Sequence, residues 1–323
     1  MATIAETPET VAELRARLTA LKEAHGESWA AIAKRVGVPV GTLTPWVSAQ
    51  YAGDNLRIAT EVRKFLAAEE ARAERAARLI QDPGFIETPS ASRFLDLFGW
   101  AHTGEIVAIS APPGTGKTEA AREYKTRASN VWLATARPSA AGLQPFQAAV
   151  CAAMGMDETR SNPERLTQRI VARMRSARGL LIVDEAQELS DRALDEARSW
   201  HDETGCGIAF VGDERVVGRL GGLKAKQLAR LHSRISMRHV QYRPSDDDAA
   251  LVAQGWGLDT PELIQRMQKL AAKPGGLRGV AKVIKLAGIV ANGEGRPIAV
   301  SDLDAAWRQL GYDVLPASEG GRA

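Results

Sequence analysis

The chain has 323 residues, of which 45% are hydrophobic and 25% are charged, the balance of an ordinary soluble globular protein. That length suits two or three domains, and no apolar run approaches the roughly 20 residues that a membrane-spanning helix needs. The net charge of +3 is too small to indicate a nucleic-acid partner, so any such surface must come from local clustering.

The cysteines and the first residues indicate where the protein works. Cys151 and Cys206 are far apart and lack metal-ligand spacing, which favours a reducing compartment without a disulfide framework. The N-terminus has no basic head followed by an apolar stretch, so it lacks the features of a signal peptide. We therefore expect a cytoplasmic protein with no membrane partner.

Residues 1–66 predict an all-α domain of short helices that contains a helix-turn-helix. Ser28 is the expected N-cap of its first helix, and Gly37 is expected to form the turn. Pro45 cannot lie deep in a helix, so we expect a shortened second helix with Thr44 as its N-cap. The expected inner-face residues are Ala30, Ile32, Ala33, Val36, Leu43, Trp46 and Val47.

This motif would place its second helix in the major groove of DNA. Its expected exposed residues are Thr42, Thr44, Ser48 and Gln50, and none of them is an arginine. Strong base readout is therefore not evident, and a helical protein-interaction domain is the alternative interpretation.

The composition changes twice after residue 66. Residues 67–81 are charged and Ala-rich, which predicts a solvated helical linker over 67–84 that Asp82-Pro83-Gly84 ends. From 85 to 244, short apolar runs alternate with amphipathic helical stretches. The expected strands are Glu105–Ser110, Val131–Thr135, Leu180–Val183, Gly207–Val211 and Arg238–Tyr242. Four of them lack polar alternation, which is typical of strands buried on both faces and predicts an α/β domain with a doubly wound parallel sheet.

The strands stop after Pro244. Residues 245–315 predict a small helical bundle, with turn signals at 273–276 and 292–295. Residues 316–323 predict a disordered tail.

The segment from Ala111 to Thr118 reads Ala-Pro-Pro-Gly-Thr-Gly-Lys-Thr and lies between an expected strand and an expected helix. This is the frame of a P-loop, whose backbone N–H groups and helix N-terminus bind phosphates. Lys117 should reach the β- and γ-phosphates of ATP, and the Thr118 hydroxyl should bind Mg²⁺. The expected contacts to the nucleotide come from Pro113, Gly114, Thr115, Gly116, Lys117 and Thr118.

The first residue of this motif is usually glycine, but here it is Ala111. Its methyl group is tolerable only if the residue keeps a negative φ. A Gly-rich turn without a ligand is the alternative interpretation of the segment.

The expected strand ending at Val183 is followed by Asp184 and Glu185. Ligands bind at the carboxyl edge of such sheets, so Asp184 is expected to hold Mg²⁺ through water and Glu185 to orient the attacking water. An exposed acidic pair is the alternative. Residues 184–187 also resemble a helicase box, but no second α/β domain fits after residue 240.

Three further residues occur in the order found in AAA+ ATPases. Asp213 follows a buried strand and resembles the sensor 1 residue. Arg234, in Ser-Arg-Ile, resembles the arginine finger that reaches a neighbour's ATP, with Arg230 as a second candidate. Arg278, in Gly-Leu-Arg, resembles sensor 2. The alternatives are a strand-end turn, a surface charge and a helix-capping loop, respectively.

A basic stripe is expected on one helix. Arg165, Arg169 and Arg173 recur every four residues and so share a face that could follow a DNA backbone. Arg137 and Arg160 are further candidates for DNA contact, and a solvated helix face is the alternative.

The order of these motifs resembles the MuB family, the target-DNA activators of phage Mu transposition, which are similar to TnsC and TniB. The stretches Gly116–Tyr124, Asn130–Trp132, Tyr51–Asn55 and Lys273–Arg278 carry the likeness, which runs from about residue 12 to 315.

The resemblance implies a Mg²⁺-dependent AAA+ ATPase of the bacterial host cytoplasm that binds double-stranded DNA without strong sequence preference. It implies a helical filament on DNA, delivery of target DNA to a transposase, stimulation of strand transfer and target immunity, without nuclease activity. Three positions depart from the family pattern, namely Ala111, Asp213 in place of asparagine, and Pro45. The basic residues that contact DNA in the family do not map one to one onto this chain.

Two other functions remain as alternatives. One is a helix-turn-helix transcriptional regulator with an ATPase signalling domain. The other is an AAA+ motor of the ExeA or DnaC type.

Overall fold

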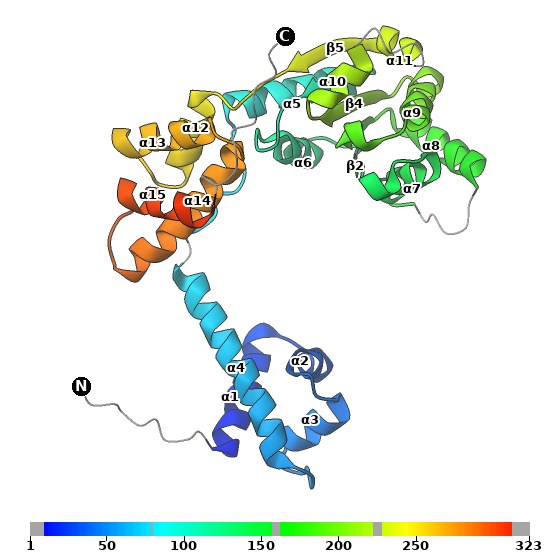
Figure 1. The fold of residues 1–323 in the computed structure, drawn as a ribbon. Coiled ribbons are helices and arrows are strands. Elements are labelled where there is room, and N and C mark those ends of the chain that lie inside the picture. The colour runs from blue at the N-terminus through cyan, green and yellow to red at the C-terminus, as the bar shows by residue number, and fades with distance from the viewer. Residues whose placement is uncertain (1–9, 79, 157–161, 222–227, 312–323) are drawn as a thin grey trace. The chain divides into compact units, whose positions relative to one another are not determined.

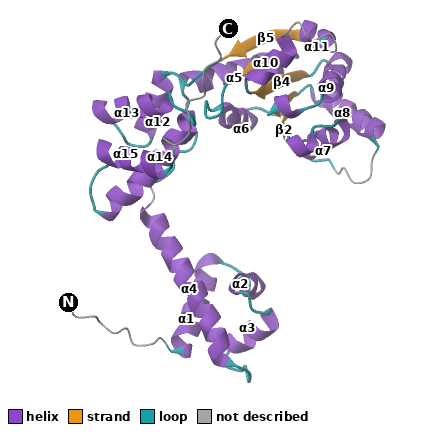
Figure 2. Ribbon diagram, viewed as in Figure 1, coloured by secondary structure: helices purple, strands orange, loops and turns teal. Residues whose placement is uncertain are grey.

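A computed structural model describes residues 10–78, 80–156, 162–221 and 228–311. The chain forms two compact units, Met1–Leu79 and Ile80–Ala323. All described strands belong to the second unit (Figure 2). Residues 316–323, predicted to be a disordered tail, and Arg160 lie outside the described residues.

The elements follow in chain order in Figure 1. The helices are α1 Val11–His25, α2 Trp29–Val36, α3 Val40–Val47, α4 Asn55–Arg78, α5 Pro89–His102, α6 Lys117–Arg127, α7 Leu143–Ala153, α8 Pro163–Ala177, α9 Asp191–Thr204, α10 Glu214–Gly221, α11 Ala229–Arg234, α12 Asp246–Gly255, α13 Pro261–Ala271, α14 Gly276–Gly293 and α15 Val300–Gln309. The strands are β1 Ile106–Ser110, β2 Val131–Thr135, β3 Leu180–Asp184, β4 Gly207–Gly212 and β5 Ile235–Val240, and short 3₁₀ turns are η1 Pro138–Ala140 and η2 Ala186–Glu188.

The N-terminal unit contains the predicted helix, turn and helix as α2 and α3. The Ser28 hydroxyl accepts a hydrogen bond from the Ala31 N–H and caps α2, and Gly37 ends it at φ 80°. Leu43 and Trp46 are buried in the core of this unit. Ala30, predicted to face inward, is exposed.

The shortened helix predicted after Thr44 was wrong. Helix α3 begins at Val40 and contains Pro45 near its end. Pro39 starts it, because the Pro39 carbonyl accepts the first hydrogen bonds, from Thr42 and Leu43. Pro45 has no N–H to donate to the Gly41 carbonyl, so this short helix lacks one of its hydrogen bonds.

Helix α4 passes through the predicted domain boundary at residues 66 and 67 without interruption. Its later part is tied to the unit by charged contacts, since Arg35 pairs with Glu69 and Arg17 pairs with Glu70. The guanidinium of Arg35 also stacks over the Phe65 ring, 5.0 Å from its centroid.

The second unit is built on a five-stranded sheet in the order β2-β3-β4-β1-β5, with every pair parallel. Alternate residues of β1 enter two cores: Ile106 packs with α7, α8 and α9, whereas Val107 packs with α5 and α6. Helices therefore cover both faces, which confirms the predicted doubly wound α/β fold (Figure 1).

Strand β5 begins three residues earlier than predicted. Ile235 pairs with Ile106 and is 6% exposed, and the register shifts before Met237. The middle of this edge strand is polar and exposed, which hides it from a search for apolar runs.

Helices α12 to α15 form a lid with its own apolar core. The lid is joined to the sheet domain by a buried carboxylate: the Ser90 backbone N–H at the start of α5 donates to Asp248 of α12 at 2.8 Å. Within the described segments, no helix is both long enough and apolar enough to cross a membrane.

Candidate nucleotide-binding site

The P-loop connects β1 to α6. Gly114 and Gly116 adopt φ 86° and 91°, a region that favours glycine. Ala111 is not among the described residues with positive φ, so its methyl group is accommodated. Its N–H donates to the Gly212 carbonyl at 3.0 Å, which holds the start of the loop on β4. The departure at Ala111 therefore leaves the loop geometry intact.

Lys117 begins α6 and is buried at the base of the loop, with 8% of its surface exposed. Its ammonium donates to the carbonyls of Ala111 and Pro112, the latter at 3.0 Å. Burial lowers the pKa of Lys117, and the carboxylates of Glu185 and Asp184 oppose that shift. The lysine charge is thus placed in a low-dielectric position, where attraction to phosphates is strong.

Thr118 and Asp184 meet where β3 ends beside α6. The Thr118 hydroxyl donates to Asp184 Oδ2 at 2.9 Å. Asp184 is 2% exposed, and burial, followed by repulsion from Glu185, raises its pKa, while the Thr118 hydrogen bond opposes the shift. A hydroxyl beside a carboxylate is an oxygen donor set of the kind that Mg²⁺ takes next to nucleotide phosphates.

Glu185 is exposed beside this pair and adopts φ 55°, a left-handed conformation that is uncommon for a residue with a side chain. Such conformations cluster at functional sites. The side-chain amide nitrogen of Gln187 donates to the Glu185 carboxylate. The side-chain amide oxygen of Gln187 accepts from the Asp213 backbone N–H at 3.3 Å. The turn after β3 is thereby linked to the end of β4.

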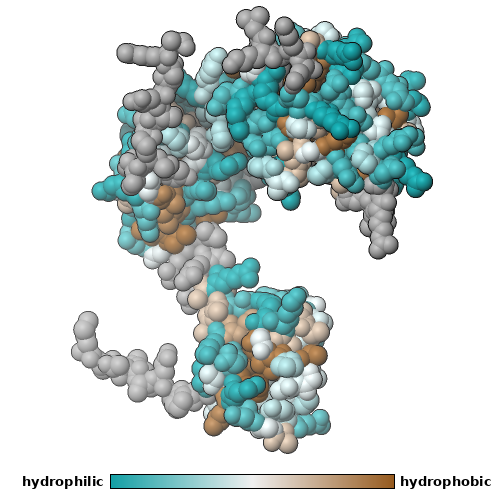
Figure 3. Space-filling model, turned by 45° about the vertical axis from the view of Figure 1, so that its right-hand side comes forward, coloured by the Kyte–Doolittle hydropathy of each residue, from teal (hydrophilic) through white to brown (hydrophobic). Residues whose placement is uncertain are grey.

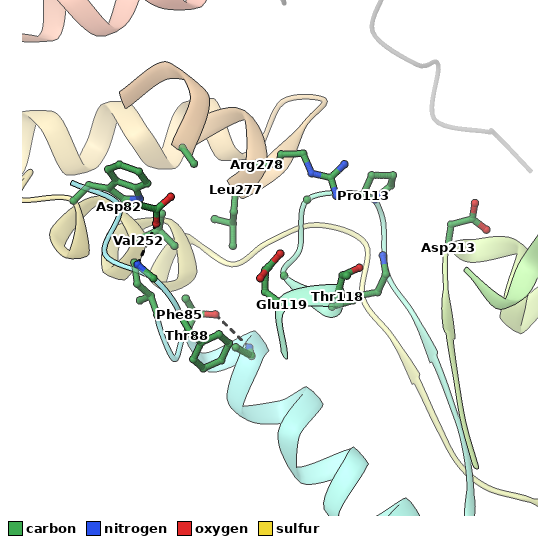
Figure 4. Close-up of a pocket in the computed structure, with 18 of the residues that line it drawn as sticks. Asp82, Phe85, Thr88, Pro113, Thr118, Glu119, Asp213, Val252, Leu277 and Arg278 are labelled. Carbon is green, nitrogen blue, oxygen red and sulfur yellow. Dashed lines mark hydrogen bonds between the residues drawn. The ribbon is translucent and has the colours of Figure 1, made fainter. Parts of the chain in front are cut away.

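A cavity of about 570 Å³ lies over the P-loop. One end is polar and contains Lys117, Thr118, Glu185 and Asp213. The other end is mainly apolar and is formed by Phe85, Ile86, Val252, Trp256 and Leu277. Figure 4 shows Phe85, Val252 and Leu277 on one side of the P-loop and Asp213 on the other. A charged end beside an apolar end suits a nucleoside phosphate.

The lid contacts the P-loop through backbone atoms. The Leu277 N–H donates to the Gly114 carbonyl at 2.8 Å. A Cβ added to Gly114 would lie 2.2 Å from the Gly275 carbonyl oxygen, so the two segments can approach this closely only as glycines. Arg278 follows in α14 and lines the cavity near Pro113 (Figure 4).

Asp213 has a cationic partner that the sequence pattern did not reveal. Arg215 pairs with the Asp213 carboxylate at 2.7 Å and with Glu188 at 2.9 Å. The hydrogen bond that Arg215 donates to Asp213 is the main cause of the raised pKa of Arg215. Because its charge is paired, the Asp213 carboxylate is less repulsive to a phosphate than a free carboxylate would be.

The remaining candidates lie away from the cavity. Arg234 ends α11, is exposed and pairs with Asp202 of α9 at 2.9 Å. Arg165, Arg169 and Arg173 lie on α8, and Arg137 lies just after β2. None of these five arginines lines the cavity among the described residues.

Several residues of this site were missed at the sequence level, among them Phe85, Trp256 and Gln187. Phe85 precedes the strands of the sheet in the sequence and Trp256 follows them, so no local sequence pattern connects these two residues. In the sequence, Gln187 is the last residue of Asp-Glu-Ala-Gln. The resemblance of this segment to a helicase box did not indicate a structural role for Gln187.

Comparisons with known proteins place this architecture in a family. An AAA domain model matches residues 101–220, and the model of the C-terminal part of the Mu B transposition protein matches residues 233–310. The ATP-dependent target DNA activator B of Escherichia phage Mu is 31% identical over 306 residues, which are 94% of this chain and 97% of that protein. The chain belongs to the MuB family. The Mu-like prophage FluMu DNA transposition protein B of Haemophilus influenzae is 32% identical over 77% of this chain and 87% of its own.

Solved structures support the fold of this MuB-family chain. The ORC2 protein of Aeropyrum pernix matches with a TM-score of 0.51 and 18% identity, over 68% of this chain and 66% of that chain. At this identity the likeness shows the fold alone. The predicted AAA+ fold and the predicted family are therefore both confirmed.

Proposed function

We propose that this chain hydrolyses Mg-ATP and binds double-stranded DNA without strong sequence preference. In its ATP-bound form it assembles as a filament on target DNA, delivers that DNA to a cognate transposase, stimulates strand transfer and contributes to target immunity. The observation that supports this most is the 31% identity to the phage Mu activator over 94% of the chain, combined with the cavity over the P-loop.

The phosphate end of the cavity supports the hydrolytic part of the proposal. Lys117 would contact the β- and γ-phosphates. Thr118 and, through water, Asp184 would hold Mg²⁺, which would supply positive charge to neutralise the phosphates. Glu185 orients the attacking water. Asp213 and Arg278 line the same cavity, and we propose that both act at the γ-phosphate.

The base of the nucleotide fits the apolar end. Phe85 and Ile86 come from the segment before α5, whereas Trp256 and Leu277 come from the lid. Because both segments contact the same base, nucleotide binding fixes the lid against the sheet domain. We propose that Arg234, exposed on the far side of the sheet domain, then completes the site of an adjacent subunit.

The DNA-binding part rests on residues that lie outside the cavity. Arg165, Arg169 and Arg173 follow one helix, α8, and Arg137 is exposed after β2. In α3, Val40 is 46% exposed and its other exposed side chains are uncharged, so this helix offers little phosphate contact. Apolar patches are also visible on the N-terminal unit in Figure 3. We therefore propose that the α8 stripe contributes more to DNA affinity than α3 does.

Electron microscopy of the protein with long DNA tests the proposal. Continuous filaments with ATP but not with ADP are expected, together with an affinity that falls steeply with salt. A single protected site in a footprint, unchanged by nucleotide, would instead favour the helix-turn-helix regulator.

The variant Glu185→Gln separates binding from hydrolysis. It retains the shape of the side chain but cannot accept a proton from water, so ATP-bound assemblies are expected to persist on DNA. The lifetime of the complex after dilution is the measurement. Release as fast as that of the wild type would contradict the role of Glu185.

A further inference from the structure

Gln187 joins two parts of the nucleotide site without lining the cavity itself. It lies in η2 and is 8% exposed. Its amide nitrogen donates to Glu185 Oε2, and its amide oxygen accepts from the Asp213 N–H at 3.3 Å. The chemistry of the partners fixes this orientation, because a carboxylate needs a donor and an N–H needs an acceptor.

The surroundings of Gln187 hold both its backbone and its side chain in place. Arg219 donates to the backbone carbonyls of Gln187 and Leu189, at 2.8 Å and 2.7 Å. A Cβ added to Gly212 would lie 2.0 Å from Gln187 Oε1, so only glycine at the end of β4 leaves room for the amide. Arg219 thus holds the Gln187 backbone, and the Gln187 amide occupies the space that Gly212 leaves.

Glu185, in contrast, is exposed and has a long side chain with several rotatable bonds. A carboxylate that orients water contributes only while it is within hydrogen-bond reach of that water. The hydrogen bond that Gln187 donates restricts the Glu185 carboxylate. The hydrogen bond that Gln187 accepts from the Asp213 N–H sets the position of its amide relative to the end of β4.

We propose that Gln187 is a positioning residue that holds the Glu185 carboxylate in register with the end of β4 and so sets the rate of ATP hydrolysis. It takes no part in nucleotide binding. This inference rests on the proposed ATPase function and on the role of Glu185 in it.

The variant Gln187→Glu provides the most specific test. It keeps the shape and the oxygen that accepts from Asp213, but it places a second carboxylate oxygen against Glu185. Two carboxylates within hydrogen-bond distance repel each other, which raises the pKa at which the pair takes up a proton. The proton then restores a hydrogen-bond donor between the two side chains. The kcat for ATP should fall about 10- to 100-fold at pH 8, as for other groups that orient a reactive side chain, and recover as the pH is lowered towards 6. The KM should stay within about twofold of wild type.

Three further variants complete the experiment. Gln187→Leu removes both hydrogen bonds, so its kcat should fall without recovery at low pH. Gln268→Glu changes an amide that donates to the Asp246 carbonyl in the lid, and its kcat should match that of the wild type at every pH. In the background Glu185→Gln, adding Gln187→Glu should cause no further loss, because the group that it positions is already absent.

The outcomes separate the two proposals. A wild-type protein without ATPase activity, with or without DNA, would overturn the proposed function. An active wild type with an unchanged kcat in Gln187→Glu and Gln187→Leu would overturn only the role of Gln187. A parallel loss of ATP affinity, or a further loss in the Glu185→Gln background, would also overturn it.

Discussion

Asp184 is the residue at which the demands of the site and of folding conflict most directly. Burial, followed by repulsion from Glu185, raises its pKa in the folded protein, although Thr118 opposes the shift. Between its unfolded and folded pKa values, the folded state therefore binds more protons than the unfolded state. Stability falls as the pH rises through this interval, and the full cost is present at neutral pH.

The variant Asp184→Asn removes this cost. Without nucleotide it should melt about 1–3 °C above the wild type at pH 7.5, with the difference narrowing as the pH is lowered towards 4. Its Mg²⁺-dependent ATP binding should be lost, because the neutral amide is a weak Mg²⁺ ligand. Calorimetry with and without Mg-ATP measures both effects. If the variant melted below the wild type at both pH values, the ionised Asp184 carboxylate would not be what costs the protein stability.

Most site residues were predictable where their chemistry is local. The P-loop and Asp184-Glu185 each lie within one short segment, and the structure brings Thr118 to 2.9 Å from Asp184 as the motif requires. The apolar end of the cavity was not predictable, because Phe85 and Trp256 meet only after the lid has packed. The partner of Asp213 was also missed, since nothing in the sequence ties Arg215 to it rather than to solvent.

Among the elements, the contact between the lid and the P-loop is made by glycines. Gly276 adopts φ 51°, and a Cβ there would lie 2.8 Å from the Gly114 carbonyl oxygen. Gly295 adopts φ 65°, but a Cβ there would meet nothing within 4 Å. The two positions share a backbone penalty of about 1–2 kcal/mol, but only a Cβ at Gly276 would meet the P-loop and, at 3.3 Å, Pro244.

We therefore expect Gly276→Ala to lose more stability than Gly295→Ala and, unlike Gly295→Ala, to bind nucleotide more weakly. The affinity of Gly276→Ala for ATP should fall about tenfold or more, since an overpacked contact typically costs 1–3 kcal/mol. Gly295→Ala should bind ATP like the wild type. Calorimetric titration with ATP, alongside thermal melts, provides the comparison. Equal ATP affinities in the two variants would show that the close approach does not affect the site.

The second link between lid and sheet domain is Asp248, which is fully buried. It accepts hydrogen bonds from the Ser90 N–H and hydroxyl at 2.8 Å and 2.5 Å, and from the Ser245 N–H at 2.7 Å. Burial raises the pKa of Asp248, but these hydrogen bonds together outweigh burial and lower it. Its contribution to stability is therefore present above the unfolded pKa and is lost as the pH falls through the lower folded pKa.

The variant Asp248→Asn should lower the free energy of unfolding by about 1.5–3 kcal/mol at pH 7, because an amide nitrogen would face the Ser90 donors. The difference from the wild type should shrink below pH 4. Urea unfolding at several pH values measures it, and Asp247→Asn, at the exposed neighbouring position, is the control. A loss that did not change with pH would point to packing rather than charge.

The regular elements were largely predictable, and the errors have physical reasons. The strand Val131–Thr135 occurs as predicted, because apolar residues buried on both faces give an unambiguous pattern. Strand β5 was shifted because an edge strand exposes polar residues. Helix α3 was misjudged because its start after Pro39 and the burial of Leu43 and Trp46 hold the helix through Pro45, whose missing N–H removes only one hydrogen bond.

At the scale of the whole molecule, Arg234 lies outside the nucleotide cavity, whose described lining contains the cations Lys117 and Arg278. Arg234 is 56% exposed, and its pair with Asp202 is a surface ion pair that contributes about 0–1 kcal/mol at most. The proposed transfer of Arg234 from this partner to the ATP of a neighbouring subunit would therefore cost little. Hydrolysis would then depend on assembly, and specific activity should rise with protein concentration and with DNA.

A mixing experiment tests whether Arg234 acts on a neighbour. Arg234→Ala and Glu185→Gln should each lose about 100-fold or more in ATPase activity, since an arginine finger and a water-orienting carboxylate both act in the transition state. In an equal mixture on DNA, an intact Glu185 site meets an intact Arg234 at about a quarter of the head-to-tail interfaces, so about a quarter of the wild-type activity should return. Arg230→Ala, one turn earlier on α11 and equally exposed, should keep wild-type activity. If the mixture stays as inactive as its components while filaments form normally, Arg234 does not complete a neighbouring site. If Arg230→Ala is inactive alone and recovers activity when mixed with Glu185→Gln, whereas Arg234→Ala does not, the arginine finger is Arg230.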